Sequence, residues 1–230
     1  MLNARLSSLL VFAAALAVPD CATAQASRWY AGLSAGQSKT SEDLVSNREG
    51  TITHISSIQT SFDDKDTAWK GLVGFRINDI LSVEANYADL GKQRLESSLL
   101  TVDPPLPGSV ITDRKVKGYG VDLVASTPIA QGIAIFGRIG AFRAETKADT
   151  TISGNVVFTD GLGGNFRSYT TRETIAKYGL GADWGFAKDA SLRLEWERYP
   201  KVGEKYETGA TGRSGEADMD VWLLGVVWRY

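Results

Sequence analysis

The chain has 230 residues, of which 43% are hydrophobic and 23% charged, and its formal net charge is -2 at pH 7. These values are typical of one ordered domain and exclude an intrinsically disordered chain. The near balance of charge and the lack of a long basic run in the sequence argue against a nucleic-acid partner.

The first 26 residues have the pattern of a cleaved secretory signal peptide. Arg5 precedes an uncharged, largely apolar stretch over residues 6–18, which is too short to span a bilayer as a helix. Two Ala-x-Ala sites place the cleavage after residue 24 or after residue 26. The only cysteine, Cys21, lies in this segment, so we expect the exported domain, residues 27–230, to contain no thiol and no disulfide.

The exported part contains no apolar stretch near 18 residues, so we expect no transmembrane helix. It contains instead eight segments in which apolar residues alternate with glycine, polar or charged residues. A period of two predicts strands, and we expect them over residues 28–38, 67–77, 81–90, 117–126, 133–143, 178–186, 192–197 and 219–230. An exported chain that stays in a membrane without helices must form a closed β-barrel.

The last of these strands shows the alternation most clearly. Counting back from the C-terminus, every second residue is apolar and aromatic residues stand at both ends of the series: Tyr230, Trp228, Val226, Leu224 and Trp222. An apolar band capped by aromatic rings is typical of a strand that crosses a hydrocarbon layer and is anchored at both interfaces.

Short and long connections alternate between the expected strands. Tight turns are indicated at residues 78–79, 127–132 and 188–189, and long polar loops at residues 39–65, 92–113, 147–172 and 200–217. Long loops are unusual in a compact soluble domain, but this division between two ends is the pattern of outer-membrane barrels. We therefore predict an all-β fold, an eight-stranded antiparallel up-and-down transmembrane β-barrel with its long loops outside the cell.

Charged residues occupy the second face of the expected strands. A Lys or Arg on the lipid face at the bilayer midplane costs about 2–4 kcal/mol, so these side chains must point inward if the chain spans a membrane. A soluble lipocalin-like barrel would have the opposite arrangement, with an apolar interior. We predict a barrel-interior ion-pair network made of Lys70, Arg76, Glu84, Asp122, Arg138, Asp183, Arg193 and Glu195, with Glu197 on the same face.

The expected turn at residues 188–189 specifies one of these pairs. If the turn is centred on Lys188, then Asp183 and Arg193 lie directly opposite each other on neighbouring strands. Side chains in this position have Cβ atoms about 5 Å apart, so we predict an ion pair. Because the interior of an eight-stranded barrel has room only for side chains, we expect a filled cylinder and not a wide pore.

Five segments resemble the OmpA-like transmembrane domain family of eight-stranded outer-membrane barrels. Two of them are similar to the family's Gly-Tyr-Gln-x-Asn and Glu-x-Gly-Tyr-x-x-Leu-Gly segments: Gly74-Phe75-Arg76-Ile77-Asn78 and Val83-Glu84-Ala85-Asn86-Tyr87-Ala88-Asp89-Leu90-Gly91. The others resemble later strands of the family: Arg138-Ile139-Gly140, Arg193-Leu194-Glu195-Trp196 and Leu224-Gly225-Val226-Val227-Trp228-Arg229-Tyr230.

The resemblance implies a location in the outer membrane of a Gram-negative bacterium. It also implies that Glu84, Asp183 and Arg193 belong to the family's interior salt-bridge network, and that Ser126 falls near the place of the family's interior lysine. Finally, it implies that the terminal strand carries the signal read by the barrel-assembly machinery, through Trp222, Gly225, Val226, Trp228 and Tyr230.

From these features we expect a structural or adhesin-like surface protein that displays four long loops. The alternatives are a small passive channel, suggested by the charged interior, and a lipocalin-like soluble ligand carrier. The expected partners are outer-membrane lipid, the assembly machinery during insertion, and host or envelope partners of the loops, with the protein itself a monomer.

We expect no catalytic residue, cofactor or metal site. The only histidine, His54, lies in the first expected loop among Thr and Ser residues, where a solvated role is the usual one. The glycine-rich segment at residues 160–165 follows no strand-to-helix unit, so we interpret it as a loop and not as a phosphate site.

Overall fold

The computed structural model describes residues 28–41, 45, 54–157, 163–204 and 215–230, so the signal-peptide prediction lies outside the described residues. The described chain forms nine β-strands: β1 (Trp29–Thr40), β2 (Ile55–Asp63), β3 (Lys65–Arg76), β4 (Leu81–Thr101), β5 (Pro107–Ala130), β6 (Ile133–Gly154), β7 (Phe166–Gly185), β8 (Ala190–Glu204) and β9 (Gly215–Arg229). No helix in this part of the chain is long and apolar enough to cross a membrane.

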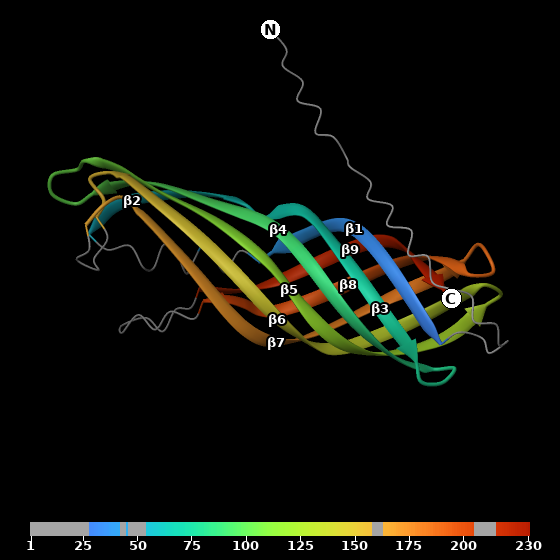
Figure 1. Cartoon of the computed structure of the whole chain (residues 1–230). Helices are drawn as coiled ribbons and strands as arrows, with labels where there is room; N and C mark the ends of the chain where they lie inside the picture. The colour runs from blue at the N-terminus through green and yellow to red at the C-terminus, as the bar shows by residue number, and fades with distance from the viewer. Residues whose placement is uncertain (1–27, 42–44, 46–53, 158–162, 205–214) are drawn as a thin grey trace, which may run out of the picture.

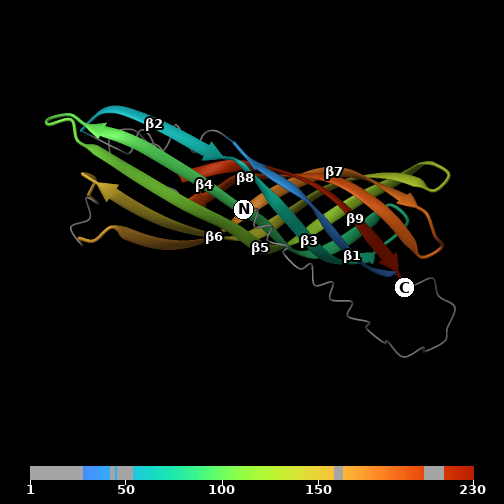
Figure 2. The same ribbon diagram turned by 90° about the horizontal axis from the view of Figure 1, so that it is seen from above.

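The strands form one antiparallel sheet that closes on itself (Figures 1 and 2). Strand order is β2-β4-β3-β1-β9-β8-β7-β6-β5, and a further pairing of β4 with β5 completes the ring. Both β2 and β3 pair with β4, β2 with residues 94–101 and β3 with residues 82–89. They are therefore two parts of a single barrel strand, and the predicted eight-stranded up-and-down barrel is confirmed.

A bulge in β4 accounts for the break between β2 and β3. The register of β4 shifts between Asp89 and Lys92, and Gly91 has a φ of 84°. A Cβ atom on Gly91 would lie 2.8 Å from the side chain of Asp66, whose carboxylate accepts a 2.6 Å hydrogen bond from the backbone of Lys92. Only glycine fits both this backbone conformation and this close approach.

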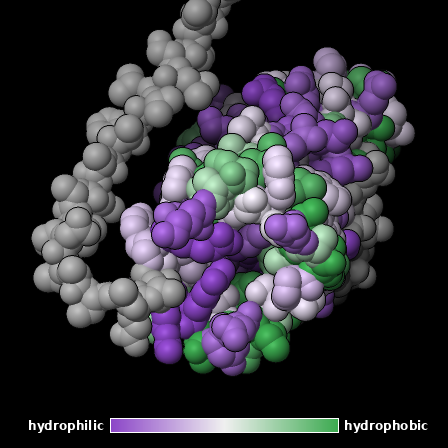
Figure 3. All heavy atoms as spheres, turned by 90° about the vertical axis from the view of Figure 1, so that its right-hand side faces the viewer, coloured by the Kyte–Doolittle hydropathy of each residue, from purple (hydrophilic) through white to green (hydrophobic). Residues whose placement is uncertain are grey.

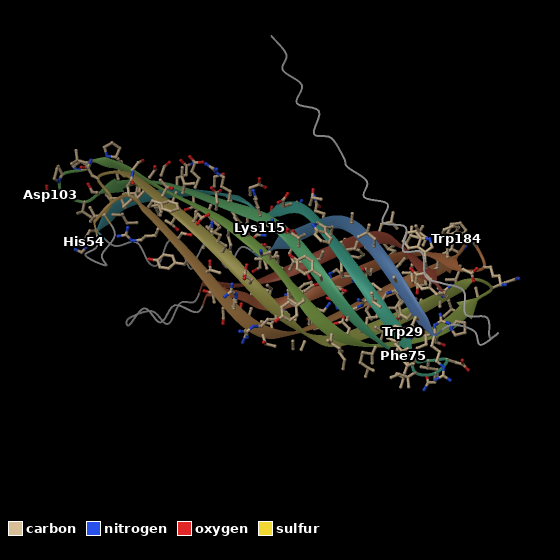
Figure 4. The ribbon with its side chains drawn as sticks, in the orientation of Figure 1. Trp29, His54, Phe75, Asp103, Lys115 and Trp184 are labelled. Carbon is tan, nitrogen blue, oxygen red and sulfur yellow. The ribbon has the colours of Figure 1, made fainter. Side chains whose placement is uncertain are left out.

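The barrel is long and uneven (Figure 1). Strands β1 and β3 have 12 residues each, whereas β4, β5, β6 and β7 have 21, 24, 22 and 20. One end, here called the turn end, has the connections 77–80, 131–132 and 186–189; the opposite end is the loop end. Figure 4 shows Trp29, Phe75 and Trp184 at the turn end, and His54 and Asp103 at the loop end.

The strands extend far into the segments that we expected to be long loops. The expected loops at residues 92–113 and 147–172 reduce to connections at 102–106 and 155–165. The segment 39–65 contains β2, and the segment 200–217 contains the end of β8 and the start of β9. In these parts of the strands the outward residues are polar, so they lack the alternation of apolar and polar residues that predicted the other strand segments.

The outer surface carries an apolar band between two rows of aromatic residues. Leu33, Ile139 and Leu180 in the band are 58–64% exposed. The row at the turn end includes Trp29, Trp184, Phe186, Trp228 and Tyr230, and the second row, part-way along the barrel, includes Trp69, Tyr87, Tyr119, Tyr178 and Trp222. An apolar band between two aromatic rows is typical of the outer surface of a β-barrel that contacts lipid.

The interior is filled in layers. Tyr30, Leu72 and Val227 pack together near the turn end. Charged residues follow, and above them, toward the loop end, lies an apolar cluster of Ala68, Ala88, Leu90, Val116, Phe142, Ala144, Tyr199, Val202, Met219, Val221 and Leu223. A smaller apolar cluster of Leu99, Val110 and Ile152 lies close to the loop end.

Candidate functional site

Eight charged side chains from six strands meet inside the barrel. They are Lys70 on β3, Glu84 on β4, Asp122 on β5, Arg138 on β6, Lys177 on β7, and Arg193, Glu195 and Glu197 on β8, here called the interior ion network. Each of the eight residues is between 0% and 4% exposed. The network holds four cations and four carboxylates, so its formal charges cancel.

Arg138 lies at the centre of the network and contacts all four carboxylates. Its guanidinium nitrogens lie 2.8 Å from both Glu195 and Glu197. The distances to Glu84 and Asp122 are 3.1 Å and 3.3 Å. Because a buried guanidinium is stabilised only by such direct partners, Arg138 depends on strands β4, β5 and β8 at once.

The two lysines bind the same carboxylates from other sides. The Nζ atom of Lys70 lies 2.5 Å from both Glu195 and Glu197. Lys177 lies 2.9 Å from Asp122 and 3.3 Å from Glu197. Glu197 also accepts a hydrogen bond from the hydroxyl of Tyr199. Glu197 therefore receives bonds from three cations and one phenol, and it links the network to the apolar cluster above.

Arg193 connects the network to the turn end. Its Nε and Nη2 atoms donate to the two carboxylate oxygens of Asp183 at 2.8 Å and 2.9 Å, and Nη1 donates to Glu84 at 2.7 Å. The plane of the guanidinium lies over the ring of Phe136, 4.5 Å from its centroid. In the β7–β8 pairing, Asp183 stands directly opposite Arg193.

Glycines give these long side chains their space. A Cβ atom on Gly140 would lie 2.1 Å from the Asp122 carboxylate. A Cβ atom on Gly181 would lie 2.3 Å from the ring of Phe136, on which Arg193 rests. The inward glycines are thus a requirement of the charged interior, because the cylinder has little spare volume.

The sequence matches the family described as Outer membrane protein beta-barrel domain over residues 8–230. The chain belongs to this family. It is an outer-membrane protein, and the apolar band between its aromatic rows faces the lipid. A search of curated proteins finds none that matches the sequence.

Several solved outer-membrane barrels are similar in structure. Neisserial surface protein A (NspA) is 14% identical with a TM-score of 0.50, covering 90% of this chain and 99% of NspA. OprG from Pseudomonas aeruginosa is 13% identical with a TM-score of 0.47, covering 89% and 97%. Ail from Yersinia pestis is 14% identical with a TM-score of 0.43, covering 87% and 98%. At these identities the likeness shows the fold alone.

In this barrel, seven of the eight residues proposed for the network from sequence take part in buried or half-buried ion pairs. Arg76 does not join them. It is exposed at the turn end, where it lines the mouth of the lumen beside Asp183. Arg76 is the last residue of β3, which runs toward the turn end, so its side chain stands at the rim of the barrel beyond the level of the network.

Lys177 is one of the two lysines of the interior ion network, and the sequence analysis did not include it. The expected strand began at Tyr178, one residue too late, although β7 begins at Phe166. The alternation itself could have found it, because Gly179, Gly181 and Asp183 define the inward face and Lys177 continues it. Ser126, near the place of the family's interior lysine, lies instead at the mouth of the lumen.

The ion network and the apolar cluster above it fill the lumen over the described residues. Among these residues there is no group of three or more His, Cys, Asp or Glu side chains arranged to hold a metal ion. His54 is exposed at the loop end, where its carbonyl accepts a hydrogen bond from Val102, far from the charged interior (Figure 4). The arrangement suits mechanical stability of the barrel, because each charge of the interior ion network has a partner of opposite sign.

Proposed function

We propose that this outer-membrane barrel is a monomeric surface-interaction protein, whose filled cylinder holds an extended sheet outside the cell. The observation that carries the proposal is the length of β4, β5, β6 and β7, which continue beyond the aromatic row at Tyr87, Tyr119 and Tyr178. We call these continuations, together with β2, the extension. A barrel needs only 9–11 residues per strand to cross a membrane, so the extension serves another purpose.

The outer face of the extension is hydrophilic. Charged and polar side chains pair across its strands, including Lys117 with Glu145 at 3.2 Å, Arg172 with Glu145 at 2.8 Å, and Ser168 with Asp149 at 2.5 Å. Such a surface is costly against hydrocarbon. Lys115, which Figure 4 shows part-way along the barrel, belongs to the same face. These side chains support placing the extension outside the membrane.

The tip of the extension exposes apolar side chains far from the lipid band. Val102 and Leu106 in the β4–β5 connection are 55% and 40% exposed, Val157 after β6 is 80% exposed, and Phe166 at the start of β7 is 52% exposed. Exposed apolar groups away from lipid often mark a surface that contacts a partner. We therefore assign the tip the contact with a host or envelope protein.

The filled interior argues against the two alternative functions. In a passive channel, charges would line an open path, whereas Arg138 and Lys70 are paired directly with buried carboxylates. A soluble ligand carrier would have an apolar interior, which is the reverse of this arrangement. We propose no catalytic activity, since the only histidine of the sequence, His54, stands apart from the charged groups.

The terminal strand supports a further partner, the barrel-assembly machinery during insertion. Trp222 and Trp228 on the outer face of β9, and Tyr230 directly after the strand, are 47–62% exposed. Val226 lies on the same face, and Gly225 faces inward, where a Cβ atom would meet the hydroxyl of Ser34 at 2.2 Å. We propose that this outward row, together with the inward Gly225, is the recognition signal.

The proposal is tested with a tip variant in which Val102, Leu106 and Phe166 are changed to serine. Bacteria producing the wild-type protein should adhere to epithelial monolayers more than cells without it, and the tip variant should lose this gain. Ile80→Ser, in a turn at the opposite end and also 58% exposed, is the matched control and should keep it. Unchanged adhesion of the tip variant, or steady conductance of the purified barrel in planar bilayers, would contradict the proposal.

A further inference from the structure

A small polar pocket opens at the turn end of the lumen, below the interior ion network. Its volume is about 30 Å³, which is room for roughly two water-sized groups. The polar part of its wall comes from Arg76, Arg193, Arg229, Ser82, Ser126 and Asp183, and we call it the mouth pocket. Figure 3 looks onto this end of the molecule, where hydrophilic residues lie between hydrophobic ones.

The charges around the mouth pocket do not cancel, in contrast to those of the network above. Three arginines face one carboxylate, that of Asp183, which is already bound on both oxygens by Arg193. Over the described residues, Arg76 and Arg229 form no ion pair within 4.0 Å. Arg229 donates only to the hydroxyl of Ser191, at 3.2 Å. Arg76 and Arg229 line the same small pocket, so their like charges repel each other.

The buried part of the wall offers further hydrogen-bond donors. Arg193 is 4% exposed and uses three of its five N–H groups on Asp183 and Glu84, which leaves two. Ser82 is also buried, at 6% exposed; its hydroxyl lies 3.0 Å from that of Tyr30, which in turn donates to Glu84 at 2.9 Å. The pocket thus places two uncompensated guanidinium groups beside the remaining N–H donors of the buried Arg193.

Guanidinium groups bind carboxylate and phosphate oxygens with two parallel hydrogen bonds, and an anion between Arg76 and Arg229 would remove their repulsion. We infer that the mouth pocket is a binding site for a small oxyanion of the phosphate class, which places up to two of its oxygens in the pocket while the rest of the anion extends toward the turn end. Arg76 follows Phe75 and Arg229 follows Trp228, so both stand at the level of an aromatic row. The oxyanion is therefore either free phosphate or the headgroup of a neighbouring phospholipid.

The test is calorimetric titration of inorganic phosphate into the folded barrel in maltoside micelles, which contain no phosphate, at constant ionic strength. The wild-type protein should bind phosphate at one saturable site. Arg76→Gln and Arg229→Gln should each weaken binding about tenfold or more, since each removes a charged hydrogen bond. Arg172→Gln, an exposed arginine of the extension, is the matched control and should bind as the wild type does.

Failure of the wild-type barrel to show saturable binding would overturn the inference. Equal weakening of phosphate binding by Arg172→Gln would also overturn the inference, because the effect would then come from the overall charge of the protein and not from the mouth pocket. Repeating the titration in phosphatidylglycerol nanodiscs identifies the source. A tenfold weaker apparent affinity for phosphate there than in micelles would show that the lipid headgroup occupies the pocket, and an equal affinity would assign it to free phosphate.

Discussion

Replacing Arg138 by methionine is the most direct test of the charged interior. The change removes the guanidinium that contacts Glu84, Asp122, Glu195 and Glu197 at 2.8–3.3 Å. Four buried carboxylates then face three cations, so one negative charge is left without compensation in a region of low dielectric. Breaking a buried ion pair in this way costs about 3–5 kcal/mol. We expect the free energy of unfolding to fall by that amount.

The assay is urea unfolding of the barrel in lipid vesicles, followed by tryptophan fluorescence and by the gel mobility of unboiled samples. Arg94→Met is the matched control, because Arg94 pairs with Asp113 at 3.4 Å with both side chains about half exposed. An exposed pair of this kind contributes about 0–1 kcal/mol. The interior variant should therefore unfold at a clearly lower urea concentration than the surface variant.

A double variant separates charge balance from side-chain size. Glu195 has only Lys70 as a second cation partner, so Arg138→Met combined with Glu195→Gln leaves three cations and three carboxylates in the network. The double variant should be less destabilised than the sum of the two single variants, by about 0.5–3 kcal/mol. Strict additivity, or a cost of Arg138→Met no larger than that of Arg94→Met, would refute the idea that these ion pairs hold the barrel together.

Three further outcomes are expected. Phe142→Ala should lower the free energy of unfolding by about 3–5 kcal/mol in the same urea assay, because the ring is fully buried in the apolar cluster. Gly140→Val should prevent folding, seen as loss of the heat-modifiable band, since its Cβ would lie 2.1 Å from the Asp122 carboxylate; Gly71→Val, which meets no atom within 4 Å at Cβ, should fold. Tyr230→Ala should slow insertion by reconstituted assembly machinery while leaving spontaneous folding into micelles unchanged.

The assignment of faces and one strand register could be obtained from the sequence alone. Alternation in β9 separates outward Trp222 and Trp228 from inward Gly225 without any knowledge of the fold. The tight turn between β7 and β8 has few residues, so counting outward from Lys188 reaches the observed pairing of Asp183 with Arg193. Both inferences work because a strand has a period of two and a short turn leaves little freedom in register.

The extension could not be recognised in the same way. In its strands the outward residues, such as Lys117, Glu145 and Arg172, face water and are polar, so the contrast with lipid-facing residues is missing. Its inward apolar residues, such as Leu99 and Ile152, alternate with polar ones in stretches also rich in Ser and Thr. The sequence of a water-exposed pair of strands therefore resembles the sequence of a polar loop, and only the pairing between strands tells them apart.

Membership of the ion network depends on depth along the barrel, which one sequence does not reveal. Arg76 and Lys177 both stand on the inward face of their strands, but Arg76 ends its strand at the mouth and Lys177 lies well inside. Depth follows from the stagger between neighbouring strands, for example Gly140 opposite Lys177 and Asp122 opposite Gly140. That stagger is a property of the closed ring and not of any one strand.

The layered interior predicts that the two ends of the barrel contribute independently to its stability. The apolar cluster around Phe142 and Met219 separates the ion network from the tip of the extension. Sites so far apart with no shared partner usually contribute additively to stability, within about 0.3–0.5 kcal/mol. Arg138→Met and Leu106→Ser should thus add in the urea assay, and Arg138→Met should leave adhesion of correctly folded protein unchanged. A larger coupling would mean that charge inside the barrel controls the shape of the tip, and the protein would then be a switch instead of a rigid support.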